Sequence, residues 1–337
     1  MSYLLRTSRI FLWFALTGLS AGIIVASSLY LYLRPNLPEV EQLLDVKLQT
    51  PLRIYSDDNK LIAEFSEKRR EPVTINQIPK LQLQAFMAAE DSRFFDHFGV
   101  DIKGLIRAAF ELVSTGSIQS GGSTITMQVA KNYFLSRDRT FIRKFNEILL
   151  ALQIERELPK DTIFELYLNK IYLGNRAYGL AAASQVYYDK PINELSLAQM
   201  AMIAGLPKAP SAYNPLANPE RALERRDWIL GRMQQLGYIS EDARALATSA
   251  PVTAGYHTRA AEVDADYVAE MARAEMVRRF GDQAYTDGYT VELTVDSKKQ
   301  QSATDALRAG LEAYDRRHGF RGEIGRFEAS DLSAAEL

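Results

Sequence analysis

An uncharged apolar run near the N-terminus constrains this chain more than any other feature. Residues Ile10 to Leu33 read IFLWFALTGLSAGIIVASSLYLYL and contain no charged side chain. At about 1.5 Å of rise per residue, a helix of this length spans a hydrocarbon core roughly 30 Å thick. Arg6 and Arg9 precede the run, and an acidic stretch at residues 39–45 follows it. By the positive-inside rule, residues 1–9 form a cytoplasmic tail and the rest of the chain lies outside the membrane.

A cleaved signal peptide is the alternative interpretation of the same run. Ala26-Ser27-Ser28 offers the small residues that a signal peptidase requires. However, the apolar run is longer than a usual signal-peptide core and continues to Leu33, where a cleavage region should become polar. We therefore expect an uncleaved single-pass anchor over residues 10–33, followed by a linker over residues 34–50.

Composition narrows the classes of function. The chain has 337 residues, 47% of them hydrophobic, which is enough for a sizeable core. The formal net charge of −2 gives no general attraction to nucleic acid, so none is expected as a partner. The absence of cysteine excludes disulfides, thiolate catalysis and cysteine zinc sites. His97, His257 and His318 are too far apart in sequence to indicate a local metal site.

The pattern of apolar residues predicts a mainly α fold with a small β-hairpin. Two β-prone runs, Leu52–Ser56 and Lys60–Phe65, are joined by the turn residues Asp57-Asp58-Asn59. From residue 78 the spacing becomes helical. The predicted helices cover Lys80–Glu90, Ser123–Leu135, Thr140–Glu157, Lys160–Asn169, Ser196–Ala204 and Glu220–Leu236.

The character of the chain changes after about residue 250. A charged helix is predicted over Ala260–Phe280, a strand over Tyr289–Val295 and a helix over Ser297–Tyr314. We therefore expect one domain over residues 51–250 and the beginning of a second over residues 251–337.

The first candidate cluster is the segment from Glu90 to Gly99. It places carboxylates, a histidine and aromatic residues at the end of an apolar helix. A partly desolvated Glu90 at such a place acquires a raised pKa and can act as a base. An ordinary polar helix end, stopped by a glycine, has the same pattern.

The second cluster runs from Gly121 to Asn132. Two glycines lead into a Ser/Thr cap and a helix, which directs free backbone N–H groups at an anion such as a phosphate. Gln128 and Lys131 are three residues apart and share one face of that helix. A plain capped helix after a loop is the alternative.

The third cluster is Arg143-Lys144-Phe-Asn-Glu147. Both cations share a helical face with Glu147, so the carboxylate sits beside groups that could neutralise a leaving phosphate. A surface ion pair is the simpler interpretation. A fourth segment, from Lys160 to Asn175, reads as a core helix and a turn.

Taken in order, these four clusters resemble the motifs of the peptidoglycan glycosyltransferases. The matching patterns are Glu-Asp-x-x-Phe-x-x-His-x-Gly at 90–99, Gly-Gly-Ser-Thr-Ile-Thr-x-Gln-x-x-Lys-Asn at 121–132, Arg-Lys-x-x-Glu at 143–147 and Lys-x-x-Ile-x-Glu-x-Tyr-Leu-Asn at 160–169. Four motifs in order are hard to reach by chance. The anchor and the residues after 250 resemble the class A penicillin-binding proteins. Because Ser-x-x-Lys and Lys-Thr-Gly are absent, residues 251–337 are interpreted as a linker and the start of an incomplete transpeptidase region, without transpeptidase activity.

The resemblance implies a lysozyme-like glycosyltransferase domain on the periplasmic side of a bacterial inner membrane. Its substrates would be lipid II and the growing glycan chain, and activator or cell-wall proteins would be its partners. Glu90 matches the general base and Glu147 the second carboxylate, on the leaving-group side. The remaining residues carried over as substrate-binding are Asp91, Phe94, His97, Ser123, Thr124, Gln128, Lys131, Asn132, Arg143, Lys144 and Lys208.

Within that set, the resemblance implies that Lys131, Arg143 and Lys144 hold the pyrophosphate together with the helix start at Ser123-Thr124. Lys208 would lie near the acceptor. A divalent cation, Mg²⁺ or Mn²⁺, often assists at the pyrophosphate in this family, but the sequence contains no dedicated metal ligand set and requires no cofactor.

Three alternatives stay open from the sequence. The segment Val100–Val113 has apolar residues at helical spacing and fits either a membrane-interface helix or an ordinary core helix. A lysozyme or lytic transglycosylase also places two carboxylates across a sugar, although it has no pyrophosphate for a basic cluster to bind. A membrane-anchored scaffold without catalysis is the third alternative, and the presence of both Glu90 and Glu147 argues against it.

Overall fold

The computed structural model describes residues 50–65, 70–115, 122–135, 140–257 and 261–319, together with scattered positions between 13 and 43. Most of the anchor predicted at residues 10–33 lies outside the described residues. Among those that are described, no helix is long and apolar enough to cross a membrane. The anchor therefore stays a prediction.

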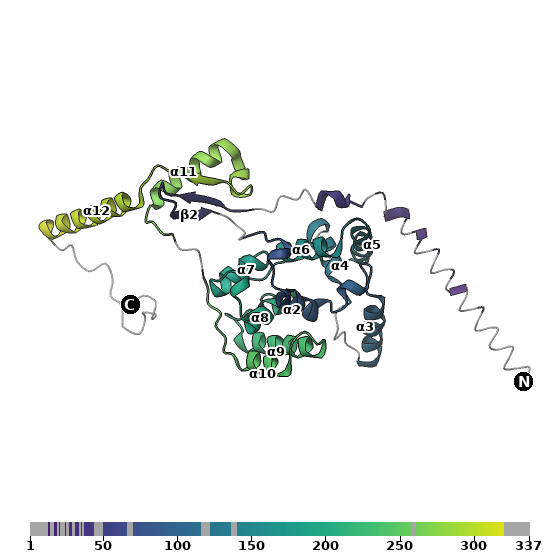
Figure 1. Cartoon of the computed structure of the whole chain (residues 1–337). Helices are drawn as coiled ribbons and strands as arrows, with labels where there is room; N and C mark the ends of the chain where they lie inside the picture. The colour runs from purple at the N-terminus through teal and green to yellow at the C-terminus, as the bar shows by residue number, and fades with distance from the viewer. Residues whose placement is uncertain are drawn as a thin grey trace, which may run out of the picture. The chain divides into compact units, whose positions relative to one another are not determined.

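The chain divides into two compact units (Figure 1). The first contains residues 1–51 and 66–258, and the second contains Leu52–Phe65 together with residues 259–337. This differs from the predicted grouping, in which the hairpin belonged to residues 51–250. The hairpin instead buries its apolar face against residues that come about two hundred positions later in the chain.

The first unit is helical, which confirms the mainly α prediction. Every helix predicted within it starts and ends within two residues of its expected position, whereas α7 and α10 were not predicted. The helices are α2 (Lys80–Glu90), α3 (Ile102–Thr115), α4 (Ile125–Phe134), α5 (Phe141–Glu157), α6 (Lys160–Lys170), α7 (Leu180–Tyr188), α8 (Leu197–Gly205), α9 (Pro219–Gln235) and α10 (Glu241–Ser249). Short 3-10 turns join them, among them η4 (Phe94–Asp96) and η6 (Leu206–Lys208).

Helix α8 forms the centre of this unit and packs between α2 and α9 (Figure 1). Its sequence, LAQMAMIAG, is apolar on nearly every side, which is typical of a helix surrounded by protein. Ser196 caps its first turn by accepting a hydrogen bond from the backbone N–H of Gln199. The packing of α2 against α8 fixes the direction of α2, and therefore the place at which its last residue, Glu90, emerges.

Helices α4, α5 and α6 form the neighbouring part of the unit. Aromatic rings join this part to α2: Phe86 and Tyr167 meet edge to face at 6.1 Å between ring centroids. Phe94 and Phe164 lie 5.3 Å apart. Both Phe86 and Phe94 are fully buried. These contacts hold the turn after α2 against α6. Helix α3 lies at the edge of the unit (Figure 1).

The second unit is built on a three-stranded sheet in the order β2-β1-β3. Strands β1 (Leu52–Tyr55) and β2 (Leu61–Phe65) pair antiparallel, which confirms the hairpin, and β1 pairs in parallel with β3 (Thr290–Glu292). The sheet packs on α11 (Asp266–Phe280), with Ile54 and Ile62 buried against Ala269. The backbone N–H of Glu262 donates to the carbonyl of Leu61 at 2.7 Å. The hairpin therefore belongs with the C-terminal residues.

The remaining helix of the second unit, α12 (Ser297–His318), starts beside the hairpin turn. Asp58 in that turn accepts a hydrogen bond from the backbone N–H of Ser297 at 3.0 Å and another from its hydroxyl. Asp296 caps the helix by accepting from the N–H of Lys299. The turn Asp57-Asp58-Asn59 thus fixes the start of α12 as well as closing the hairpin.

Candidate active site

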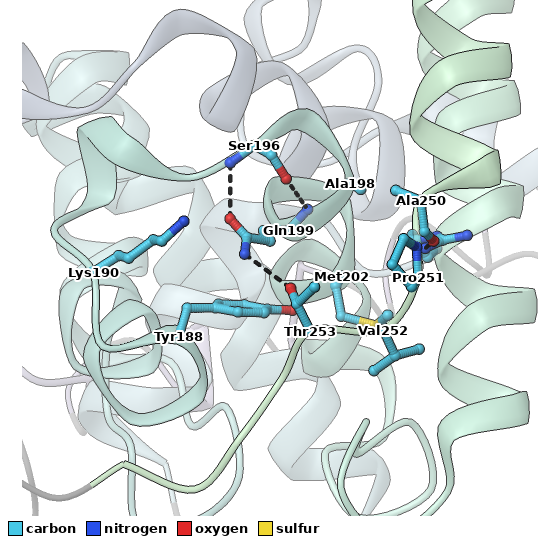
Figure 2. Close-up of a pocket in the computed structure, with 11 residues that line it drawn as sticks. Tyr188, Lys190, Ser196, Ala198, Gln199, Met202, Ala250, Pro251, Val252 and Thr253 are labelled. Atoms are coloured by element: carbon cyan, nitrogen blue, oxygen red, sulfur yellow. Dashed lines mark hydrogen bonds between the residues drawn. The ribbon is translucent and has the colours of Figure 1, made fainter.

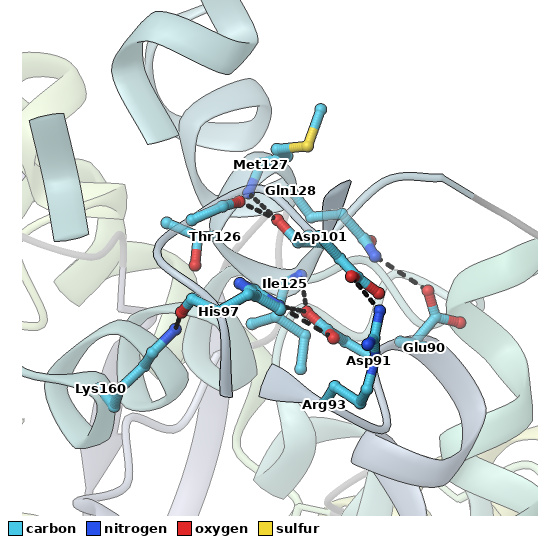
Figure 3. Close-up of polar contacts among 12 residues, drawn as sticks. Glu90, Asp91, Arg93, His97, Asp101, Ile125, Thr126, Met127, Gln128 and Lys160 are labelled. Carbon is cyan, nitrogen blue, oxygen red and sulfur yellow. Dashed lines mark hydrogen bonds and ion pairs between the residues drawn. The ribbon is translucent and has the colours of Figure 1, made fainter. Parts of the chain in front are cut away.

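Glu90, at the last position of α2, is a nearly buried carboxylate with few partners. Its side chain is 12% exposed. The side-chain amide of Gln128 on α4 donates to Glu90 Oε2 at 2.8 Å (Figure 3). Nη2 of Arg225 on α9 lies 3.9 Å from Oε1, too far for a hydrogen bond. We refer to Glu90, Gln128 and Arg225 as the Glu90 site.

Burial raises the pKa of Glu90 above its ordinary value of 4.5. The hydrogen bond from Gln128 and the charges of Arg225, Lys208 and Lys131 act in the opposite direction, but they do not cancel the effect of burial. A carboxylate in this state accepts a proton more readily than a solvated one. This is the property that a general base requires.

Asp91 and His97 form a buried pair beside Glu90. Asp91 Oδ2 lies 2.9 Å from His97 Nε2 and accepts a hydrogen bond from the backbone N–H of Ile125 at 3.1 Å (Figure 3). The pair therefore joins the turn after α2 to the start of α4. The Asp91 carboxylate and the His97 ring are therefore engaged with other groups of the protein.

The start of α4 differs from the open anion site that the sequence predicted. The first N–H, from Ile125, is taken by Asp91, and the N–H of Met127 donates to the Thr124 hydroxyl at 3.1 Å. Thr124 is 2% exposed, and its hydroxyl donates to the carbonyl of Gly99 at 2.6 Å. Internal acceptors therefore take two of the N–H donors at this helix start.

Gly99 itself is required by the close approach of α5. Its φ of 81° lies in the left-handed region, and a Cβ at this position would come within 2.7 Å of the carbonyl oxygen of Ala151. Any side chain would therefore push the 94–99 turn away from α5. The glycine at the end of the first motif is explained by this contact.

Glu147 on α5 is the second buried carboxylate, with a side chain 2% exposed. Arg143 Nη1 donates to Oε2 at 3.1 Å, and Lys144 Nζ donates to Oε1. The hydroxyl of Ser123 donates to Oε1 at 3.1 Å. We refer to these four residues as the Glu147 cluster. The predicted ion pair is thus buried on the carboxylate side, and the two cations remain partly exposed.

The other predicted residues differ in exposure. Lys131 on α4 and Lys208 in η6 are exposed cations whose charges act on Glu90 and lower its pKa. Asn132 is half-buried on α4. Phe94, in contrast, is fully buried among Phe95, Phe164 and His97, so it packs in the core and does not line a substrate surface. The expectation that Phe94 lines the site is corrected accordingly.

Sequence reasoning missed a second network under the same turn. Lys160 donates to the carbonyl of His97 and to Glu155, each at 2.7 Å, and its ammonium lies 4.3 Å from the ring centroid of Phe94. Glu155 also accepts from the hydroxyl of Thr126. Helical periodicity does not predict this pair, because Glu155 and Lys160 are five residues apart and the helix breaks between them at Leu158-Pro159. Its effect is to fix the 94–99 turn against α4, α5 and α6.

Arg225 was also missed, although its helix was predicted. It lies 135 positions after Glu90 in the chain, and only the packing of α9 against α2 brings the two together. Nothing in the local sequence distinguishes it from the neighbouring Arg226, which instead donates to the carbonyls of Thr248 and Ala250 at 2.7 Å.

No metal site is evident in the part of the chain that the structure describes, where no three His, Asp or Glu side chains gather to hold an ion. A divalent cation at the pyrophosphate stays a prediction.

A small cavity lies elsewhere in the first unit, between the start of α8 and residues 250–253 (Figure 2). Gln199 bridges this gap by accepting from the N–H of Ser196 and donating to the hydroxyl of Thr253. None of the predicted site residues lines the cavity. Its polar groups hold the segment after α10 in place, and we assign it no chemistry.

Comparison with known proteins places the chain in a family. The family profile described as Transglycosylase matches residues 58–234, and this chain belongs to that family. It is 59% identical to penicillin-binding protein 1A of Pseudomonas aeruginosa over 96% of this chain and 40% of that protein. It is 50% identical to penicillin-binding protein 1A of Escherichia coli over 87% of this chain and 35% of that protein.

A solved structure agrees with this assignment. The 2.6 Å crystal structure of penicillin-binding protein 1A from Haemophilus influenzae matches with a TM-score of 0.50 and 38% identity, covering 86% of this chain and 33% of that one. The chain spans about two fifths or less of the length of the relatives named above.

Proposed function

We propose that this chain is a peptidoglycan glycosyltransferase that polymerises lipid II into glycan strands. The observation that carries the proposal is the state of Glu90, a buried carboxylate whose pKa is raised and whose Oε1 has no hydrogen-bond donor among the described residues. Membership of the transglycosylase family supports the same reaction class. Both features fit a base that accepts a proton from a sugar hydroxyl.

In the proposed reaction, Glu90 accepts the proton of the 4-hydroxyl of the acceptor GlcNAc. The hydroxyl oxygen forms a bond to the anomeric carbon of the growing chain, and the bond from that carbon to the lipid pyrophosphate breaks. The pyrophosphate leaves with the bonding electrons, and the anomeric carbon is inverted. Glu90 later loses its proton to solvent, which restores the base.

The leaving pyrophosphate requires cations, and we propose Arg143, Lys144 and Lys131 for this role. In the Glu147 cluster one buried carboxylate is shared by two cations, so the cluster keeps a net positive charge. The side chains of Arg143 and Lys144 are 20% and 40% exposed, which leaves donors open to a phosphate oxygen. Glu147 then acts by orienting these cations. Lys208, beside Tyr213 and Glu90, is proposed to contact the acceptor.

An apolar surface near the site supports access to a lipid-linked substrate. Ile102 and Ile106, one turn apart on α3, are 67% and 65% exposed, and Phe95 and Phe98 are 54% and 57% exposed. Large exposed apolar side chains that follow one another closely along the chain, as these do, are typical of a membrane or partner contact. We propose that this surface faces the outer leaflet of the inner membrane, with residues 10–33 as the anchor.

The experiment is incubation of the purified full chain with labelled lipid II in detergent, with the products separated by gel. We expect a ladder of lipid-terminated glycans that lengthens with time. A protein that makes no ladder but cleaves preformed glycan would be a hydrolase, and the proposal would be rejected. Heat-denatured protein is the control for uncatalysed products.

A further inference from the structure

Arg225 contacts the end of α2 in two ways at once. Its Nη2 donates to the carbonyl oxygen of Ala89 at 3.2 Å and lies 3.9 Å from Oε1 of Glu90. Ala89 is the residue immediately before Glu90. A single guanidinium group therefore binds the backbone of the last turn of α2 and places a positive charge beside the carboxylate of Glu90.

The surroundings of Arg225 fit this side chain closely. A Cβ at Gly205 on α8 would lie 3.0 Å from Arg225 Cγ, so the glycine provides the space for the stem. The guanidinium carbon lies 4.4 Å from the Trp228 ring centroid and 5.9 Å from that of Tyr213. Only 7% of the side chain is exposed. Arg225 is thus confined to one position and shielded from water.

Other groups also face Glu90, and they differ in charge and exposure. Gln128 on α4 and the buried Tyr167 on α6 are neutral. Asp91 follows Glu90 on the chain and uses its oxygens on His97 and Ile125. Two lysines complete the set, Lys131 on α4 and Lys208 in η6, and both are exposed. Water and salt screen an exposed charge more than a buried one. Of the described cations facing Glu90, Arg225 is the buried one.

We propose that Arg225 is a positioning residue that keeps Glu90 ionised and directed toward the acceptor hydroxyl. The inference rests on the proposed role of Glu90 as the base. The separation of 3.9 Å matters, because a close bidentate pair would hold both carboxylate oxygens and compete with the incoming proton. At this distance Arg225 favours the charged form and leaves Oε1 open.

The test is the pH dependence of kcat/KM for lipid II polymerisation. The acidic limb of this profile is the range in which kcat/KM falls because the base becomes protonated. Removing an opposite charge at this distance in Arg225→Met moves that limb to higher pH by about one pH unit. Arg225→Lys should return the limb toward its original position, because it restores the charge. Arg232→Met is the matched control, since Arg232 lies on the same helix and its side chain donates to Gln235, not to the end of α2. An acidic limb that stays in place in Arg225→Met would overturn the inference.

A second measurement does not depend on activity. Thermal unfolding of wild type, Arg225→Met, Glu90→Gln and the double variant gives the coupling between the two side chains. We expect little coupling at pH 4, where Glu90 is protonated, and growing coupling as the pH rises to 8. A coupling independent of pH would overturn the inference even if the wild type polymerises. A wild type that fails to polymerise would reject the proposed function, and the coupling would still test the ion pair.

Discussion

Glu90 on α2 and Glu147 on α5 are both buried carboxylates of the first unit, yet their surroundings are opposite. Glu147 accepts from two cations and a hydroxyl, so both of its oxygens are bound to charged donors. Among the described residues, Glu90 accepts one hydrogen bond, from a neutral amide, and the nearest cation lies 3.9 Å away. A carboxylate whose oxygens are already held organises its partners. One that is buried and left partly open is available to take a proton.

We expect the largest difference between Glu90 and Glu147 in the rate of catalysis. Glu90→Gln keeps the shape of the side chain but cannot accept a proton, so we expect the polymerisation rate to fall by about 100-fold or more. Product gels with lipid II measure this rate. Glu157→Gln, on an exposed residue at the end of α5, is the matched control. If Glu90→Gln lengthens glycan chains as fast as this control, Glu90 is not the base.

For the stability of the fold, we expect Glu147 to matter more than Glu90. Glu147→Gln leaves Arg143 and Lys144 beside each other without the buried carboxylate they share. Because both cations are partly exposed, we expect a loss of about 2 kcal/mol, below the usual cost of breaking a fully buried pair. Thermal unfolding in detergent measures the loss. If Glu147→Gln unfolds at the wild-type temperature, the cluster does not have the structural role assigned to it.

The pH dependence of stability tests the raised pKa of Glu90. Because the pKa of Glu90 is raised by folding, the folded state binds a proton more tightly than the unfolded state. The resulting stability is fully present below pH 4.5 and is lost as the pH rises through the folded pKa. Glu90→Gln lacks this effect, so its unfolding temperature should rise relative to wild type between pH 4 and pH 8. A constant difference over that range would contradict the raised pKa.

Gln128 offers a smaller test on the Glu90 side. Gln128→Leu removes the one hydrogen bond that Glu90 accepts from a described residue, and this bond favours the charged carboxylate. We expect the acidic limb of kcat/KM to move upward by about half a pH unit. An unchanged or lowered limb would show that the amide does not stabilise the ionised form.

Ser123 offers the matching test on the Glu147 side. Ser123→Ala removes one of three donors to Glu147, and we expect a loss of about 1 kcal/mol in stability. The acidic limb should stay where it is in wild type. A limb that moves with Ser123→Ala would mean that Glu147, and not Glu90, controls the protonation step.

Much of the fold could be predicted because helical periodicity and cap residues are local signals. Helix α2 was predicted with its observed bounds, Lys80–Glu90. Helix α7 was missed because it is buried on almost every side and so lacks the polar face that periodicity detects. The hairpin was predicted, but its partner could not be, because β1 pairs with β3 more than two hundred residues away.

The candidate site was predictable to the extent that motifs are local. Arg143 and Lys144 were expected to meet Glu147 on one helix, and they do. Arg225 and Gln128 reach Glu90 only through packing between helices, so spacing gave no sign of either contact. The start of α4 is less open than the spacing predicted for a related reason. Asp91, from a different segment, takes the N–H of Ile125.

The most direct test is the pH profile of kcat/KM on lipid II for wild type, Glu90→Gln and Glu147→Gln, measured side by side. We predict an acidic limb in wild type with an apparent pKa above 4.5, the ordinary value for Glu. The residual rate of Glu90→Gln should lack that limb, and Glu147→Gln should keep it at a lower rate. If the limb persists in Glu90→Gln and disappears in Glu147→Gln, the base has been assigned to the wrong carboxylate.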